Sequence, residues 1–135
     1  MKEIKDIIEL QTHDQAKKLS FATRYLVQIN FTFDLSVTSN CFSGSSHFCV
    51  RIGEIKAFCN QLTKMHSLLV GSAKLCDNDS DAFVIFTSSD FGRVTVRGQV
   101  GGSHEEHFVR FEFQTDQTCI SQFVSDFEKL LAGSK

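Results

Sequence analysis

The chain has 135 residues, a formal net charge of −2 and a hydrophobic fraction of 41%. This length fits a single domain over residues 1–135, which buries about two-thirds of its surface on folding and needs no disulfide or metal for stability. The composition excludes a disordered chain, a collagen-like chain, a coiled coil and a strongly basic nucleic-acid module.

Phenylalanine supplies most of the aromatic side chains, with 14 Phe, one Tyr and no Trp. Rings without a polar group suit a core, because Tyr and Trp are the usual choice where rings meet water. The five cysteines form no CxxC pair, and an odd number leaves one unpaired in any disulfide scheme. The first ten residues lack the apolar core of a signal peptide, and no stretch approaches the length of a membrane span. We therefore expect a cytoplasmic protein with reduced thiols and no membrane partner.

Residues 1–27 form a poorly patterned N-terminal segment. Ile4, Ile7 and Ile8 fit the stripe of a short helix, and residues 4–10 equally fit an edge strand. We favour the strand because of a resemblance given below.

From residue 28 the pattern is regular. Residues 28–37 and 47–52 alternate between apolar and polar side chains, which predicts two half-buried strands joined by a turn over residues 38–46. Gly53 ends the second strand. Helical spacing then predicts an amphipathic helix of about three turns, with a buried stripe of Ile55, Phe58, Cys59, Leu62 and Met65.

The rest of the chain predicts four strands and a helix. The strands are expected at residues 69–75, 82–87, 93–100 and 109–114, with turns at 77–80 and 89–92 and a loop at 101–106. Thr115 or Asp116 caps the last helix. Its apolar stripe consists of Ile120, Phe123, Val124, Phe127, Leu130 and Leu131.

This order of elements predicts an α+β fold. The links between strands are short, so we expect a largely antiparallel sheet of about six strands. Each helix has one apolar stripe, and the economical arrangement packs both helices on one face of that sheet.

Four stretches between Val27 and Leu131 carry a family resemblance. They are Phe42-Ser-Gly after an alternating strand, the helix with Ile55, Phe58 and Leu62 that leads to Gly71-Ser-Ala-Lys-Leu, the late strand Gly92-Arg-Val-Thr-Val-Arg-Gly, and Phe111-Glu-Phe-Gln-Thr-Asp-Gln before the last helix. In these the chain resembles the WapI-type immunity proteins, a family of small bacterial proteins named for toxins of wall-associated type. The resemblance implies a protein that binds and neutralises a cognate toxin, and it implies no catalytic or cofactor residue.

Several short motifs have an ordinary structural explanation. Asp90-Phe-Gly spells a kinase tripeptide, but the chain is too short for a kinase, and a hairpin turn explains it. His104 and His107 lie three residues apart on a loop, where a zinc helix needs ligands four apart. Cys41, His47 and Cys49 lack a fourth zinc ligand at a sensible spacing. We expect no metal and no cofactor.

Nucleophilic and acid–base chemistry also lack support. Cys59 shares a predicted helix with His66 but lies on its apolar face, which indicates an inert buried thiol. Cys119 lies near a helix start, where a thiolate is favoured, and we prefer a structural role for it. Asp34 and Glu112 fall on a polar sheet face among arginines, which indicates ion pairs. We therefore expect a protein that is not an enzyme.

The polar face of the sheet is the remaining candidate site. If the helices cover residues such as Ile29, Phe31, Phe111 and Phe113, the opposite face exposes arginines, and arginine is enriched in interfaces and binds carboxylates through two bonds. The candidate partner-binding residues are Arg51, Arg93, Arg97, Arg110, Asp34 and Glu112. An ordinary solvated sheet face is the alternative explanation.

These observations favour a non-enzymatic protein-binding domain. The partner is expected to be a protein toxin, blocked by direct association. The alternative is a structural or self-associating domain, such as a homodimer formed through the exposed face or an edge strand. The net negative charge argues against a nucleic-acid partner.

Overall fold

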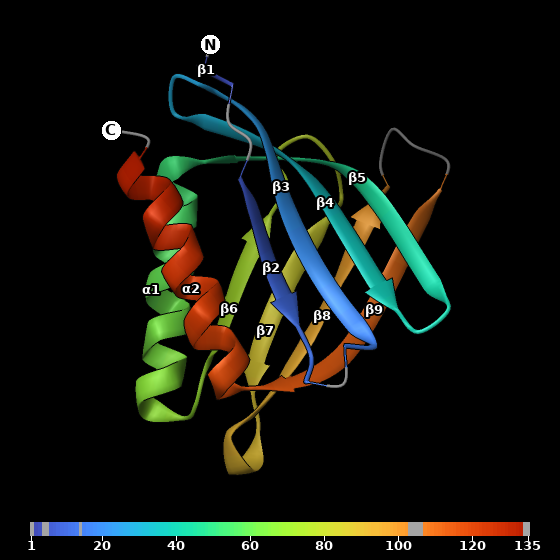
Figure 1. Ribbon diagram of the computed structural model, residues 1–135, viewed down its shortest axis with the longest axis vertical. Helices are drawn as coiled ribbons and strands as arrows, with labels where there is room; N and C mark the ends of the chain where they lie inside the picture. Colours follow the sequence, from blue (N-terminus) through green and yellow to red (C-terminus); the bar gives the residue numbers. More distant parts are fainter. Residues whose placement is uncertain (1, 4–5, 14, 103–106, 134–135) are drawn as a thin grey trace.

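The computed structural model describes residues 2–3, 6–13, 15–102 and 107–133. The strands form two antiparallel sheets (Figure 1). Sheet A contains β1 (Lys2–Glu3), β2 (Ile7–Gln11), β3 (Lys17–Val27), β4 (Asn30–Ser39) and β5 (Phe42–Arg51). Sheet B contains β6 (Ser72–Cys76), β7 (Phe83–Ser88), β8 (Arg93–Gly101) and β9 (Phe108–Asp116). β1 and β2 pair with successive parts of β3, so they form one interrupted edge strand.

Helix α1 (Ile52–Leu68) links the two sheets, and α2 (Gln117–Gly133) follows sheet B. The α+β class and the antiparallel pairing are confirmed. The strands outnumber the six expected and divide between two sheets, because α1 carries the chain away from β5, the edge of sheet A, before β6 begins. The alternation of side chains defines each strand but does not specify the sheet to which it belongs.

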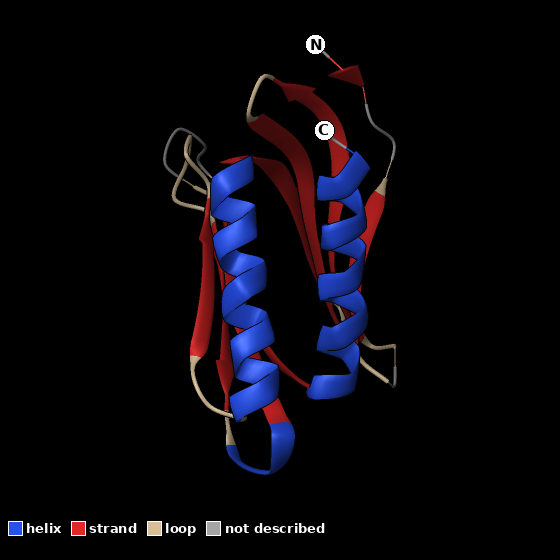
Figure 2. Ribbon diagram, turned by 90° about the vertical axis from the view of Figure 1, so that its left-hand side faces the viewer, coloured by secondary structure: helices blue, strands red, loops and turns tan. Residues whose placement is uncertain are grey.

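The two helices close one side of the molecule. α1 contacts the edge strand β6, α2 contacts the edge strand β2, and the helices contact each other. Figure 2 shows them side by side with the strands behind them. On the other side, β5 contacts β8 and β9. A Cβ at Gly44 would lie only 2.8 Å from Cγ2 of Val109, so this approach of β5 to β9 requires glycine.

Phenylalanine rings fill the space between the sheets and the helices. The Phe21 ring of β3 lies 5.3 Å from the Phe127 ring of α2, and the Phe58 ring of α1 lies 5.6 Å from the Phe86 ring of β7, measured between centroids. All four side chains are fully buried. The prediction that phenylalanine builds the core is confirmed.

Both helices begin where polar side chains satisfy free backbone N–H groups. The Arg51 N–H donates to Glu54 Oε1 at 3.0 Å at the start of α1. At α2, Asp116 Oδ1 accepts from the N–H groups of Thr118 at 3.0 Å and Cys119 at 3.4 Å, so the predicted Asp116 cap is confirmed. The hydrogen bond from the Thr118 hydroxyl lowers the pKa of the Asp116 carboxyl below its ordinary value.

The predicted apolar stripes of both helices are buried. On α1 these are Ile55, Phe58, Cys59, Leu62 and Met65, and on α2 they are Ile120, Phe123, Val124, Phe127, Leu130 and Leu131. Neither described helix has an apolar run that would carry it across a membrane.

The sequence prediction missed β3. Its alternation is interrupted by a register shift between Thr23, which pairs with Phe33 of β4, and Tyr25, which pairs with Thr32, so Arg24 is the extra residue. The favoured strand near residues 4–10 is present as β2, while Ile4 lies outside the described residues. Ile29 was expected inside, but it lies in the β3–β4 turn and is 57% exposed. The expected turn at 38–46 is mostly strand, because β4 continues to Ser39 and β5 starts at Phe42.

A buried carboxylate joins the two sheets. Asp77 follows β6 and is 8% exposed, and its Oδ1 accepts the Cys49 N–H of β5 at 2.9 Å. The Asn78 N–H donates to the Cys49 carbonyl at 2.9 Å. The loop after β6 therefore satisfies both backbone polar groups of an edge-strand residue, which fixes sheet B relative to sheet A.

Candidate protein-binding surface

The candidate binding residues divide between the two sheets. Arg93, Arg97, Arg110 and Glu112 lie on β8 and β9 and are exposed on the outer face of sheet B. Asp34 and Arg51 lie on β4 and β5, on the outer face of sheet A. The apolar residues between them face the core shared by the two sheets, so the outer faces point away from each other. The expectation that these six residues share one face is therefore wrong.

On the outer face of sheet A, Asp34 is paired within the face, while the exposed Arg51 has no ion pair among the described residues. Asp34 accepts two hydrogen bonds from Arg24 Nη1, the shorter of 3.1 Å, and lies 3.6 Å from His47 Nε2. The bond to Asp34 raises the pKa of Arg24 above its ordinary value. Small side chains occupy the centre of this face, where the Ser36 hydroxyl donates to the Ser45 hydroxyl at 3.1 Å. We find little on this face that requires a charged partner.

The outer face of sheet B carries an excess of positive charge. The strand register places Lys74, Ile85, Arg97 and Glu112 in one row across the sheet. Arg110 lies in the next row, and Arg93 lies four residues before Arg97 on β8. Four cationic side chains thus accompany two carboxylates, Glu112 opposite Arg97 and Asp116 opposite Arg93, although the whole chain has a net charge of −2.

Arg110 is held in a fixed orientation. Its Nε–H donates to Gln99 Oε1 at 3.0 Å, and its guanidinium lies 5.4 Å from the centroid of the Phe108 ring. Gln99 is 5% exposed, and its Nε2 donates to the carbonyl of Gly101 at 3.0 Å. A buried amide whose donor and acceptor are both used has little freedom to rotate. Gln99 therefore positions Arg110.

Two other arginines of this face, Arg93 and Arg97, are exposed. Among the residues that the structure describes, neither Arg93 nor Arg97 forms an ion pair. Arg97 and Arg110 border a shallow hollow of about 420 Å³. The other residues that line it are Lys74, Phe83, Ile85, Gly98, Phe111 and Glu112.

Exposed apolar side chains lie at one end of the molecule. We call Leu68, Leu69, Val70 and Phe91 the apolar tip; each is at least 56% exposed, and Phe91 is 98% exposed. Leu69 ends α1 with φ 57°, and Phe91 has φ 64° in the turn between β7 and β8. Positive φ is unfavourable for bulky side chains and is frequent at functional sites. Sequence reasoning assigned this turn to a hairpin and missed the exposed ring.

The residues tested for catalysis do not converge. Asp34 and Glu112 lie on opposite outer faces, so they do not form a carboxylate pair. Cys59 is 4% exposed, and burial raises the pKa of its thiol to about 12, which confirms an inert thiol. His66 is exposed, and its Nδ1 lies 3.3 Å from Gln117 Oε1. The loop that carries His104 lies outside the described residues.

The comparison with protein families identifies the kind of domain. A family model described as the immunity protein WapI-like family matches residues 7–133. The chain belongs to this family. The WapI-like match begins with β2 and therefore includes β3. The resemblance seen in the sequence began only at Val27, the last residue of β3. The search of curated proteins found no match to this chain.

Proposed function

We propose that this WapI-like immunity protein neutralises a protein toxin by direct, non-enzymatic association, and that the toxin docks on the outer face of sheet B. The mechanism is steric and electrostatic masking of the toxin. The observation that carries the proposal is the positive surface of Arg93, Arg97 and Arg110, on a chain whose net charge is negative. The complementary surface on the toxin is rich in carboxylates.

The geometry of the arginines supports recognition of carboxylates. Arg93 and Arg97 lie four residues apart on one strand face, a separation of about 13 Å. Arg110 is oriented before any partner arrives, because Gln99 fixes its Nε. An arginine that is already ordered loses less conformational entropy on binding.

The apolar tip completes the surface. The four strands of sheet B cover about 19 Å by 20 Å, roughly 400 Å², which is about half of what one side of a standard interface buries. Phe91, in the turn between β7 and β8, adds an exposed aromatic side chain at the end of this face. Binding hot spots combine aromatic residues with arginine in this way.

The proposal predicts that a toxin is encoded beside this gene, and the test uses that toxin. The affinity for the purified toxin domain and the residual toxin activity are measured for the wild type and for Arg97→Glu. We expect charge reversal to weaken binding by at least tenfold, and added salt to slow association for the wild type. Thermal unfolding of each variant checks that the fold is retained.

The matched control is Arg51→Glu, on the outer face of sheet A. It reverses one exposed arginine in the same way and places an acidic residue at a helix start, where it is tolerated. We expect this variant to inhibit the toxin like the wild type. If Arg51→Glu loses inhibition while Arg97→Glu keeps it, the toxin docks on sheet A and the proposed surface is wrong. If Arg97→Glu changes only the mass of the chain in solution, the face mediates a homodimer.

A further inference from the structure

Three side chains of types that can bind metal ions meet where sheet A approaches the start of α2. His13 follows β2, Asp116 ends β9, and Cys119 lies in the first turn of α2. His13 Nε2 lies 2.8 Å from Asp116 Oδ2 and 3.8 Å from Cys119 Sγ. The three ligand atoms all lie within 4.8 Å of one another. We propose that His13, Asp116 and Cys119 bind a zinc ion.

The ligand types and their separations suit zinc. Imidazole, carboxylate and thiolate are all zinc ligands, and the bond lengths are about 2.1 Å to nitrogen or oxygen and about 2.3 Å to sulfur. Tetrahedral geometry then requires about 3.4 Å between nitrogen and oxygen and about 3.6 Å between nitrogen and sulfur. The observed 2.8 Å and 3.8 Å differ from these by less than 1 Å. The His13 side chain is 72% exposed, so its ring can make this adjustment without disturbing the core.

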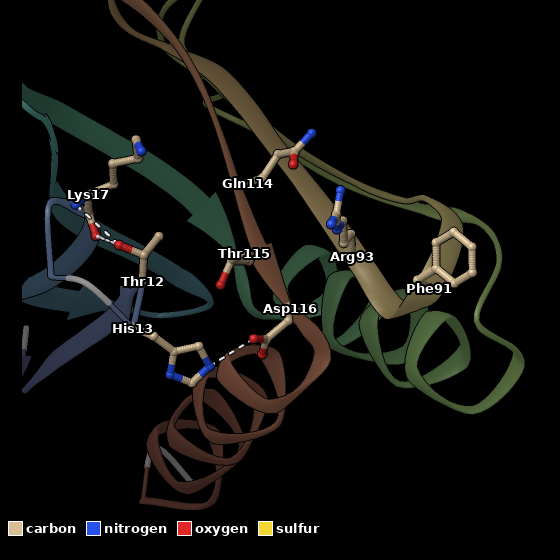
Figure 3. Close-up of a pocket in the computed structure, with 8 residues that line it drawn as sticks. All are labelled: Thr12, His13, Lys17, Phe91, Arg93, Gln114, Thr115 and Asp116. Carbon is tan, nitrogen blue, oxygen red and sulfur yellow. Dashed lines mark hydrogen bonds and ion pairs between the residues drawn. The ribbon is translucent and has the colours of Figure 1, made fainter.

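Asp116 is oriented for this role by the helix that it caps. Its Oδ1 accepts from the N–H groups of Thr118 and Cys119, and from the Thr118 hydroxyl. Its Oδ2 is left to face His13 (Figure 3). Hydrogen bonds to the second oxygen are the usual way in which a metal-binding carboxylate is held.

A His13–Asp116 ion pair alone does not explain the cluster. An exposed ion pair contributes little stability, at most about 1 kcal/mol. His13 Nε2 lies near three groups at once, since Thr118 Oγ1 is 3.3 Å away in addition to Asp116 and Cys119. One ring nitrogen can share a single proton with only one of them, whereas a cation can bind the nitrogen, the carboxylate and the thiolate together.

Three protein ligands leave one zinc position open. The hollow beside His13 and Asp116 has a volume of about 490 Å³ and is also lined by Lys17, Arg93 and Thr115 (Figure 3). Thr115 is 9% exposed, and its Oγ1 has no hydrogen-bond partner within the described part of the chain. A buried hydroxyl without a partner requires an explanation. Figure 3 shows this hydroxyl on the side of the hollow that holds His13 and Asp116. On this proposal, the partner of the Thr115 hydroxyl is a water or an anion that occupies the fourth zinc position.

The test uses the purified chain after treatment with a chelator, with Co²⁺ as a spectroscopic probe and Zn²⁺ as its competitor. We expect one Co²⁺ per chain, a thiolate-to-cobalt absorption band, and displacement of the cobalt by one equivalent of Zn²⁺. Zinc should also raise the unfolding temperature of the wild type. The absence of metal binding at a ratio of one per chain would overturn the proposal.

Ligand variants locate the ion. Cys119→Ser should abolish the thiolate band, and His13→Ala and Asp116→Asn should each weaken binding at least tenfold; Asn keeps an oxygen that caps α2. The matched control is Cys41→Ser, an exposed thiol on the β4–β5 turn, which should bind metal like the wild type. The His104→Ala/His107→Ala double variant should also be unchanged. Loss of the band in Cys41→Ser, or loss of binding in the double histidine variant, would place the metal elsewhere and refute the site.

Discussion

Replacing Asp77 by Ala should lower the stability of the fold by removing a contact between the two sheets. The Asp77 carboxylate accepts hydrogen bonds from the N–H groups of Cys49 and Asp79 and from the Ser80 hydroxyl. The Cys49 N–H belongs to β5 and is partly buried, so its loss of a charged acceptor costs about 2 kcal/mol. The other two donors, Asp79 N–H and the Ser80 hydroxyl, lie in the loop after β6 and not in a strand, and each contributes about 0.5 kcal/mol. The variant should therefore lose about 3 kcal/mol of stability.

This loss is measurable by thermal and urea unfolding. For a chain of this length the unfolding entropy is about 0.28 kcal/mol/K, so about 3 kcal/mol lowers the unfolding temperature by about 10 °C. The matched control is Asp79→Ala, which removes an exposed carboxylate two residues away and should change stability by less than about 0.5 kcal/mol. If Asp77→Ala loses less than about 1 kcal/mol, or no more than the control, the carboxylate does not join the sheets.

Two further predictions concern close packing and a buried thiol. Gly98→Ala should destabilise the fold by about 3 kcal/mol in urea unfolding, because a Cβ there would lie 2.2 Å from the Phe83 carbonyl oxygen. Gly53→Ala is the control, since a Cβ at Gly53 would have nothing within 4 Å. Equal stability of the two variants would contradict the reasoning. Burial raises the pKa of Cys59 to about 12 from the ordinary 9.0. The stabilising contribution of the buried Cys59 thiol is therefore complete below pH 9 and is lost as the pH rises toward 12. Cys59→Ala should accordingly cost less stability between pH 9 and pH 12 than it does below pH 9. The wild-type thiol should resist alkylation at pH 8 until the chain unfolds.

The sequence determined most elements but not their grouping into sheets. Strict alternation located β4, β8 and β9, and helical spacing located both helices, because a one-sided core imposes those periods. β3 escaped because the bulge near Arg24 shifts the alternation by one residue. The division into two sheets depends on contacts such as that between Asp77 and Cys49, residues 28 positions apart that no local pattern connects.

The candidate site was predicted in part for the same reason. Alternation on β8 and β9 correctly placed Arg97, Arg110 and Glu112 together on an outer face. It assigned Asp34 to that face only because a single sheet was assumed. The exposure of Phe91 depends on a positive φ, which turn composition alone does not specify for phenylalanine. The cluster of His13 with Cys119 joins residues 106 positions apart in the sequence.

Arg93 connects the two proposed sites, and this determines which variants can separate them. It begins β8 on the outer face of sheet B, and it also lines the hollow beside His13 and Asp116. Reversal of its charge would alter the electrostatic potential at both sites, since Arg93 belongs to the outer face of sheet B and its strand partner is Asp116. Arg97 lies about 13 Å further along the strand and does not line that hollow. Toxin binding is therefore best tested at Arg97 and metal binding at Cys119, and failure of either proposal leaves the other intact.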